Sequence, residues 1–221
     1  MHRRQVPVLF VLLASLVLQG AASAQYVQGS FEQPFPAQAV TLYGSVGSEH
    51  PALDSARIGP DGRFRFAQKQ SAAGFYQIGI NGTDRVDIIL DPREELVDLA
   101  FHGTPLQRNV TVVSSSENER LWTYKLLSRA AQERASLIQS QRAEAFPLDT
   151  GLLRRLSAEE ILLRSDLEQV LDSLANIEPN GQFAYGVNMD LRLEAAAQLG
   201  PDAILRTFNF SEPRALRSSA Y

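Results

Sequence analysis

The chain has 221 residues, a formal net charge of −4 at neutral pH and no cysteine. The absence of cysteine excludes disulfides, thiolate metal sites and catalysis by a cysteine thiol. The acidic balance argues against a nucleic-acid-binding protein, which needs clustered cations, because Lys69 and Lys125 are the only lysines and the arginines are spread along the chain.

Residues 1–24 have the features of an export signal. Arg3 and Arg4 give a basic start, residues 6–18 form a nearly unbroken apolar run, and residues 22–24 read Ala-Ser-Ala, the pattern of a signal-peptidase site. The apolar run is shorter than the about 20 residues that a membrane-spanning helix needs. We predict cleavage after Ala24 and a periplasmic or cell-envelope protein with no membrane span in the mature chain.

Residues 25–115 alternate short runs of β-branched and aromatic residues with turn signals, which is typical of a β-sandwich or barrel. In the stretch IGPDGRFRF (residues 58–66), the Pro-Asp-Gly triplet predicts a tight turn between two strands. Side chains alternate along a strand, so Phe64 and Phe66 should share the core face. The other runs predicted as strands span residues 39–44, 75–80, 85–90, 96–101 and 109–113. Consecutive strands joined by short turns should pair antiparallel.

Residues 116–207 change to helical periodicity. Ser116 with Glu119, and Ser157 with Glu160, fit capping boxes that start helices. The first helix should be amphipathic, run for about 25 residues until Pro147 and project from the sandwich. Its apolar positions are Trp122, Leu126, Leu127, Ala130, Ala131, Leu137 and Ile138.

The second helix should end at residues 178–181, and the third should span residues 183–199 before the stop signal Gly200-Pro201. The last residues, 208–221, lack periodicity but carry Phe208, Phe210, Leu216 and Tyr221, so a further element is expected to cover them and the chain is expected to be truncated relative to longer relatives. We therefore predict an α+β protein: an antiparallel β-sandwich of seven or eight strands in residues 25–115, about three helices in residues 116–207, and an irregular tail.

Groups with catalytic or metal-binding potential are few. Once the leader is removed only His50 and His102 remain, and neither forms a helical i, i+4 pair with another ligand, so a mixed site with carboxylates is conceivable but ordinary loop or strand-end positions are favoured. Asp84, Asp87 and Asp91 lie close together, but their spacing does not fit a calcium loop, which favours a solvated strand edge.

The remaining patterns favour no catalytic function. The stretch GSVGS (residues 44–48) lacks the spacing of a nucleophile elbow, and no phosphate-binding loop is present. Of the adjacent pairs Glu94-Glu95 and Glu159-Glu160, the second is explained by a helix start, where negative charge is favoured. We assign no catalytic, cofactor-binding or metal-binding residue and no cofactor.

Two sets of residues bear on glycans. Asn81, Asn109 and Asn209 each begin an Asn-x-Ser/Thr triplet, which is a glycosylation acceptor in a eukaryotic secretory pathway but a frequent chance match in a bacterial chain. The aromatic residues Tyr43, Phe75, Tyr76 and Trp122 could line a sugar platform, although strand alternation favours the core for most of them.

The order of these features resembles a bacterial family. The chain is similar to the Bacteroidetes-type extracytoplasmic thiol-disulfide oxidoreductases, which carry an all-β region before a thioredoxin-like (TlpA/ResA-type) domain. The matching features are the export signal and the stretches VTLYGSV, ARIGPDGRFRF, AGFYQIGI, VDIILDPREELVDLAF and VVSSSENERLWTYKLL. The most specific elements are SSEN (residues 115–118) and NFSEPRALRS (residues 209–218). The resemblance covers most of the mature chain and implies an accessory envelope module. The Cys-x-x-Cys motif of that family is missing, so no catalytic residue carries over.

The leading hypothesis is a non-catalytic exported module that binds a protein partner or a downstream domain. The alternative is a glycan-binding or small-ligand-binding β-sandwich protein. An enzyme with a dispersed hydrolytic site ranks last, because nothing in the sequence requires it.

Overall fold

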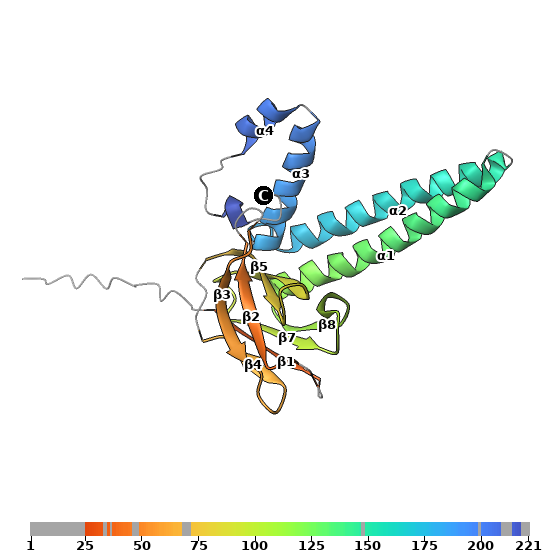
Figure 1. Cartoon of the computed structure of the whole chain (residues 1–221). Helices are drawn as coiled ribbons and strands as arrows, with labels where there is room; N and C mark the ends of the chain where they lie inside the picture. Colours follow the sequence, from red (N-terminus) through yellow and green to blue (C-terminus); the bar gives the residue numbers. More distant parts are fainter. Residues whose placement is uncertain are drawn as a thin grey trace, which may run out of the picture.

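The computed structural model describes residues 25–32, 35, 37–45, 49–67, 72–146, 149–198, 200–208 and 214–217. The predicted leader at residues 1–24 lies outside these residues, as do Asn209, Phe210 and Tyr221. The described chain is an α+β protein with a two-sheet sandwich followed by helices, as predicted (Figure 1). Among the described helices, none is both long and apolar enough to cross a membrane.

The described part of the sandwich contains eight strands in two four-stranded sheets. One sheet has the order β4-β1-β7-β8 and the other β3-β2-β5-β6. The strands are β1 (Tyr26–Phe31), β2 (Ala39–Gly44), β3 (Ala52–Arg57), β4 (Arg63–Arg65), β5 (Gly74–Gly79), β6 (Arg85–Leu90), β7 (Leu96–Phe101) and β8 (Val110–Ser114).

The pairing is not antiparallel throughout. β1 runs parallel to β7, with Tyr26 opposite Leu96 and Phe31 opposite Phe101. A parallel pair needs a long connection, and here it contains all the strands from β2 to β6. The expectation that short turns join paired neighbours is therefore wrong for β3–β4 and β6–β7, whose strands lie in opposite sheets.

The stretch IGPDGRFRF makes the predicted turn but not a two-stranded ladder. The Gly62 N–H donates to the Gly59 carbonyl at 2.9 Å, and Gly62 takes the positive φ of 80° that the turn requires. After the turn, β4 pairs with β1 instead of β3. The crossing places Phe64 and Phe66 in the core on the same side of β4, as alternation predicted. The turn thus joins the two sheets at the sandwich edge.

The core lies between the sheets and has an aromatic centre. Phe31 packs against Phe101 with 4.8 Å between ring centroids and against Phe64 with 5.5 Å. Such aromatic pairs contribute about 0.5–1.5 kcal/mol each beyond the area they bury. Val27, Val97 and Leu99 complete the inward side of β1 and β7.

The helices are α1 (Ser116–Ala145), α2 (Thr150–Ile177), α3 (Gln182–Ala197) and a short α4 (Pro201–Thr207). α1 and α2 pack on each other as a long antiparallel hairpin, hereafter the arm, which extends away from the sandwich (Figure 1). At 1.5 Å per residue, the 30 residues of α1 span about 45 Å. The predicted projection is therefore present, although α1 is longer than the expected 25 residues.

Both predicted capping boxes are misplaced. α1 is capped by Ser115, whose hydroxyl accepts a hydrogen bond from the Asn118 N–H at 3.2 Å. α2 begins at Thr150, and its cap, Asp149, lies eight residues before the predicted cap Ser157. Ser157 instead bonds the Leu153 carbonyl from within the helix, so the Ser-x-x-Glu pattern there marks no helix start.

The prediction that the apolar positions of α1 share one buried side is only partly confirmed. Trp122 and Ile138 are buried, but Leu126, Leu127 and Leu137 are exposed. Apolar residues therefore lie on both sides of this helix.

α3 and α4 form a second, smaller core with Phe208. It contains Met189, Ala196, Phe208 and Ala215 as buried members. Pro201 begins α4, so Gly200-Pro201 separates two helices, as predicted for a stop signal. Phe208, expected to need a further covering element, is covered within the chain.

Candidate functional site

The buried polar residues gather where the sandwich meets the arm. Apart from Gln25, every buried polar or charged residue of the described chain lies there: Asp91, Ser115, Glu117, Asn118, Arg120 and Gln182. With Arg93 and Glu94 they form what we call the junction cluster. Buried polar groups are costly unless they are paired, so this cluster fixes a specific arrangement of elements.

Glu94 caps the N-terminus of α1 from outside the helix. Its carboxylate accepts hydrogen bonds from the Ser115 hydroxyl at 2.5 Å, the Ser116 hydroxyl at 2.8 Å and the Glu117 N–H at 2.9 Å. A negative charge is favourable at this end because the helix dipole is positive there. The segment between β6 and β7 thereby holds the start of the arm.

Asn118 joins α1 to the sheet as a neighbouring strand would. Its amide oxygen accepts from the Ile89 N–H at 2.8 Å, and its amide nitrogen donates to the Ile89 carbonyl at 2.7 Å. The amide nitrogen also donates to the Ser115 hydroxyl at 2.7 Å. Asn118 is fully buried, so water cannot replace these bonds.

Glu117 holds the N-terminus of α3. Its carboxylate accepts from the Phe183 N–H at 2.6 Å and from Arg120 at 2.8 Å. A Cβ on Gly181, the residue before α3, would lie 2.3 Å from a Glu117 carboxylate oxygen, so the close approach requires glycine. Burial raises the pKa of Glu117, although the Phe183 and Arg120 hydrogen bonds oppose the rise.

Asp91 and Arg93 close the cluster on the sandwich side. The Arg93 guanidinium contacts Asp91 at 2.6 Å, Glu178 at 3.3 Å and Glu117 at 3.6 Å. Burial raises the pKa of Asp91, but the hydrogen bonds and charge of Arg93, with the charge of Arg214, outweigh burial and lower it.

Arg214 brings the tail to the same place. It donates to the Gln182 side chain at 2.9 Å and to the Gly181 carbonyl at 3.2 Å, and its guanidinium lies 4.1 Å from the centre of the Tyr185 ring. Glu117 of SSEN and Arg214 of NFSEPRALRS, which belong to the two most specific elements of the sequence resemblance, therefore both contact the start of α3.

In an enzyme, two carboxyls whose pKa values are pushed apart can serve as an acid–base pair. Here Asp91 and Glu117 are both buried, and each carboxylate accepts a hydrogen bond from a backbone N–H group and contacts an arginine. The geometry therefore describes a structural joint between the sandwich, the arm and α3.

Replacing Asp91 with asparagine should reduce stability at pH 7 by about 1–2 kcal/mol, because the charge-assisted bonds to Arg93 are lost. Since folding lowers the pKa of Asp91, its contribution is present above the ordinary aspartate pKa and is lost as the pH falls through the folded-state value. Glu117, whose pKa is raised, has the opposite dependence. Urea unfolding of the wild-type chain and of Asp91→Asn from pH 7 to pH 3 checks this. The difference between their free energies of unfolding should shrink toward pH 3, and a constant difference would contradict the prediction.

The three neighbouring aspartates do not converge. Asp84 accepts from the Leu106 N–H at 2.8 Å, Asp87 pairs with Lys125 of α1, and Asp91 belongs to the junction cluster. The predicted solvated strand edge is therefore wrong for Asp91, because a tertiary partner, Arg93, allows its burial. Within the described residues no three or more His, Asp or Glu side chains form a metal-binding group.

His50 and His102 lie outside the strands. His50 is exposed and 3.4 Å from the Gly44 carbonyl. His102 follows β7 and contacts Glu32 at 2.7 Å and Thr111 at 3.1 Å.

The aromatic residues and asparagines that were related to glycans make contacts within the fold. Tyr76 and Trp122 are buried, Phe75 is half-buried against the core, and the half-buried Tyr43 carries the Arg85 guanidinium 3.9 Å above its ring. Asn81 bonds the Thr83 and Asp84 N–H groups of its own turn, and Asn109 bonds the Pro105 carbonyl.

The arm is held together by polar as well as apolar contacts. Ile138 and Leu156 are buried between its helices. Arg134 pairs with Glu159 at 2.5 Å, and Arg142 pairs with Glu160 at 2.6 Å. The explanation of Glu159-Glu160 as a helix start is thus wrong, because both lie beyond the first two turns of α2 and pair with α1.

Large apolar side chains are exposed along the arm. They are Leu126, Leu127, Leu137, Phe146, Ile161, Leu162 and Ile177. The first three are among the predicted apolar positions of the first helix. Exposed apolar patches mark interaction surfaces in soluble proteins, so these side chains make the arm a candidate interaction surface.

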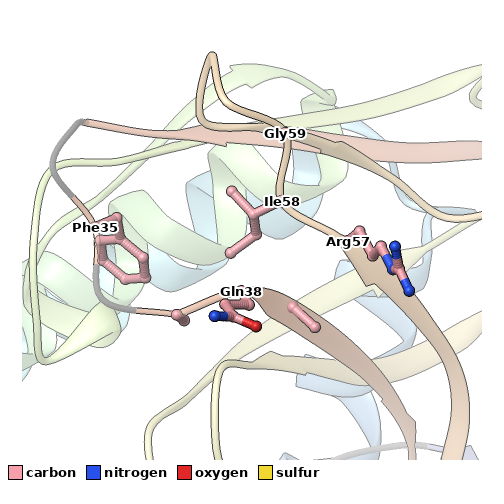
Figure 2. Close-up of a pocket in the computed structure, with 7 residues that line it drawn as sticks. Phe35, Gln38, Arg57, Ile58 and Gly59 are labelled. Carbon is pink, nitrogen blue, oxygen red and sulfur yellow. The ribbon is translucent and has the colours of Figure 1, made fainter.

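An open depression lies at one end of the sandwich. It has a volume of about 520 Å³ and is lined by Phe35, Ala37, Gln38, Ala39, Arg57, Ile58 and Gly59. Figure 2 shows Phe35 and Ile58 on opposite sides of it, with Gln38 below and Arg57 to one side. No sequence motif indicated this depression, since its residues come from separate strands and loops.

No family model, curated protein or solved structure matches the chain. The arm, the junction cluster and the depression are therefore the observations that bear on function.

Proposed function

We propose that the chain is an exported, non-catalytic module that binds a protein partner through its arm. The observation that carries the proposal is the projecting hairpin (Figure 1), along which large apolar side chains are exposed. Such a helix pair needs another protein surface to cover its apolar residues.

The exposed stripe on α1 is the surface that we assign to this partner. Leu126, Ala130 and Leu137 are spaced four and seven residues apart, so they share one side of the helix, where the exposed Glu133 lies between Ala130 and Leu137. An amphipathic helix or an apolar groove fits such a stripe. The sequence resemblance makes a thioredoxin-like protein of the cell envelope the first partner to test. The lack of cysteine supports a division in which the partner supplies any thiol chemistry.

Photo-crosslinking in the native host tests this function. A photoreactive residue at Leu126 or Leu137 should form an adduct with one defined polypeptide other than the chain itself. The same residue at Arg63, which is exposed on the sandwich, is the matched control and should not. Absence of any adduct from both arm positions would contradict the proposal.

Partner binding should also depend on the leucines themselves. Leu126→Asp and Leu137→Asp should each weaken the complex about tenfold or more, because each places a charge in an apolar contact. Fold stability should be unchanged, since both side chains are exposed. Titration of the purified partner with each variant measures the loss.

Ligand binding at the sandwich is the second candidate function, and the depression between Phe35 and Ile58 favours it. Glycan or small-molecule arrays would show saturable binding that Arg57→Ala abolishes and the exposed control Arg63→Ala leaves intact. Equal binding by both variants would show that the depression is not the binding site.

A further inference from the structure

We propose that the outer face of α2 binds a second copy of this chain in antiparallel orientation. The outer face consists of the residues that point away from α1 at spacings of three and four: Arg154, Arg155, Ala158, Ile161, Leu162, Ser165, Asp166, Glu168, Gln169 and Asp172. All are exposed except the half-buried Ser165. On the opposite side, Leu156 is buried and Leu163 and Leu167 are half-buried. This inference goes beyond the proposed function, which uses α1.

The centre of the outer face is apolar. Ile161 and Leu162 are 69% and 62% exposed, which is high for large aliphatic side chains in the middle of a helix. Small or neutral residues, Ala158 and Ser165, lie one turn away on each side. A second helix can therefore approach this centre closely.

The charges on the outer face are separated by sign. Arg154 and Arg155 lie toward the tip of the arm, and Asp166, Glu168 and Asp172 lie toward its base. The ion pairs that join the two helices of the arm use other residues, Arg134 with Glu159 and Arg142 with Glu160. The outer face thus presents a basic end and an acidic end to its surroundings.

This separation makes the face complementary to itself. A two-fold axis through the point between residues 163 and 164 lies about 13 Å from Arg155 and about 13 Å from Asp172 along the helix. Antiparallel pairing about this axis therefore places the arginines of each copy beside Asp172 of the other, with Ile161 and Leu162 at the centre. Parallel pairing would place like charges together, which is unfavourable. A surface that matches itself about a two-fold axis is the defining property of a closed dimer.

Charge variants of the full chain test the pairing. Arg154→Asp with Arg155→Asp makes the outer face entirely acidic, and Asp166→Arg with Glu168→Arg and Asp172→Arg makes it entirely basic. Each variant alone should be monomeric by sedimentation equilibrium at about 100 µM. An equimolar mixture should form a heterodimer, because residues 154 and 155 of each copy then lie beside a residue 172 of opposite charge. The wild-type chain should show twice the monomer mass.

Two further variants complete the design. Leu162→Glu should give a monomer, while Arg63→Asp, at an exposed arginine of β4 on the sandwich, should leave the wild-type dimer unchanged. The thermal unfolding midpoint of each variant verifies that it is folded. A monomeric wild-type chain, or a mixture of the acidic and basic variants that stays monomeric, would overturn the proposal. Photo-crosslinking at Leu126 and Leu137 tests the surface of α1 and not that of α2. The failure of the proposed function can therefore be distinguished from the failure of the proposed dimer.

Discussion

Replacing Asn118 with alanine should lower the free energy of unfolding by about 3–5 kcal/mol. The substitution removes both hydrogen bonds to the main chain of Ile89 and leaves a buried N–H and a buried carbonyl unpaired. Each such group costs about 1–3 kcal/mol, in addition to the cavity left by the side chain. Urea unfolding followed by the fluorescence of Trp122, the sole tryptophan, measures the change.

Gln132→Ala is the control for Asn118→Ala. Gln132 lies exposed on the same helix, so its removal should change stability by less than about 0.5 kcal/mol. Asn118→Asp adds a second comparison, because aspartate still accepts from the Ile89 N–H but cannot donate to its carbonyl when ionised. If Asn118→Ala cost no more than Gln132→Ala, the proposed joint between α1 and β6 would not exist in solution.

Replacing Gly181 with alanine should lower the free energy of unfolding by about 2–4 kcal/mol. The new Cβ would lie 2.3 Å from a Glu117 carboxylate oxygen and 2.9 Å from the Glu178 carbonyl oxygen. The φ of −65° at Gly181 suits alanine, so the effect measures the contact and not backbone strain. The carboxylate must move, and the Phe183 N–H then loses its partner. Chemical denaturation of the purified chain gives the value.

A double-mutant cycle identifies the cause. In a Glu117→Ala background the clash with the carboxylate is absent, so Gly181→Ala should cost less there by at least about 1 kcal/mol. Gly82→Ala is the matched control, because a Cβ at Gly82 meets no atom within 4 Å. Equal costs of Gly181→Ala in the two backgrounds would show that Glu117 does not hold the start of α3.

The strands and helices could be predicted from the sequence because their signals are local. Alternation in RVDIIL and LVDLAF, and the Pro-Asp-Gly turn, predicted β6, β7 and the reversal before β4. The pairing could not be predicted in the same way. Whether β4 returns to β3 or crosses to β1 depends on the burial of Phe64 and Phe66 between two sheets, and the residues of the turn are the same in both cases.

The junction cluster could not be predicted because it depends on contacts between distant residues. Asn118 and Ile89 are 29 residues apart, and Glu117 and Phe183 are 66 apart. In the sequence Glu94 is only one of two adjacent glutamates, yet in the structure it caps α1 from a different element. The capping boxes failed for a related reason: a Ser-x-x-Glu pattern also occurs inside a helix, where Glu160 pairs with Arg142 of α1.

The parallel pairing of β1 with β7 has a consequence for the order of events during synthesis. The first strand must wait for partners that are made much later, since Tyr26 pairs with Leu96 and Gln28 with Arg65. At about 5–20 residues per second, a ribosome needs roughly 4–14 s to add the residues between Tyr26 and Leu96. During this interval the β3-β2-β5 ladder can form from residues already made, while β1 remains open to chaperones or to any machinery that requires an unfolded amino-terminal segment.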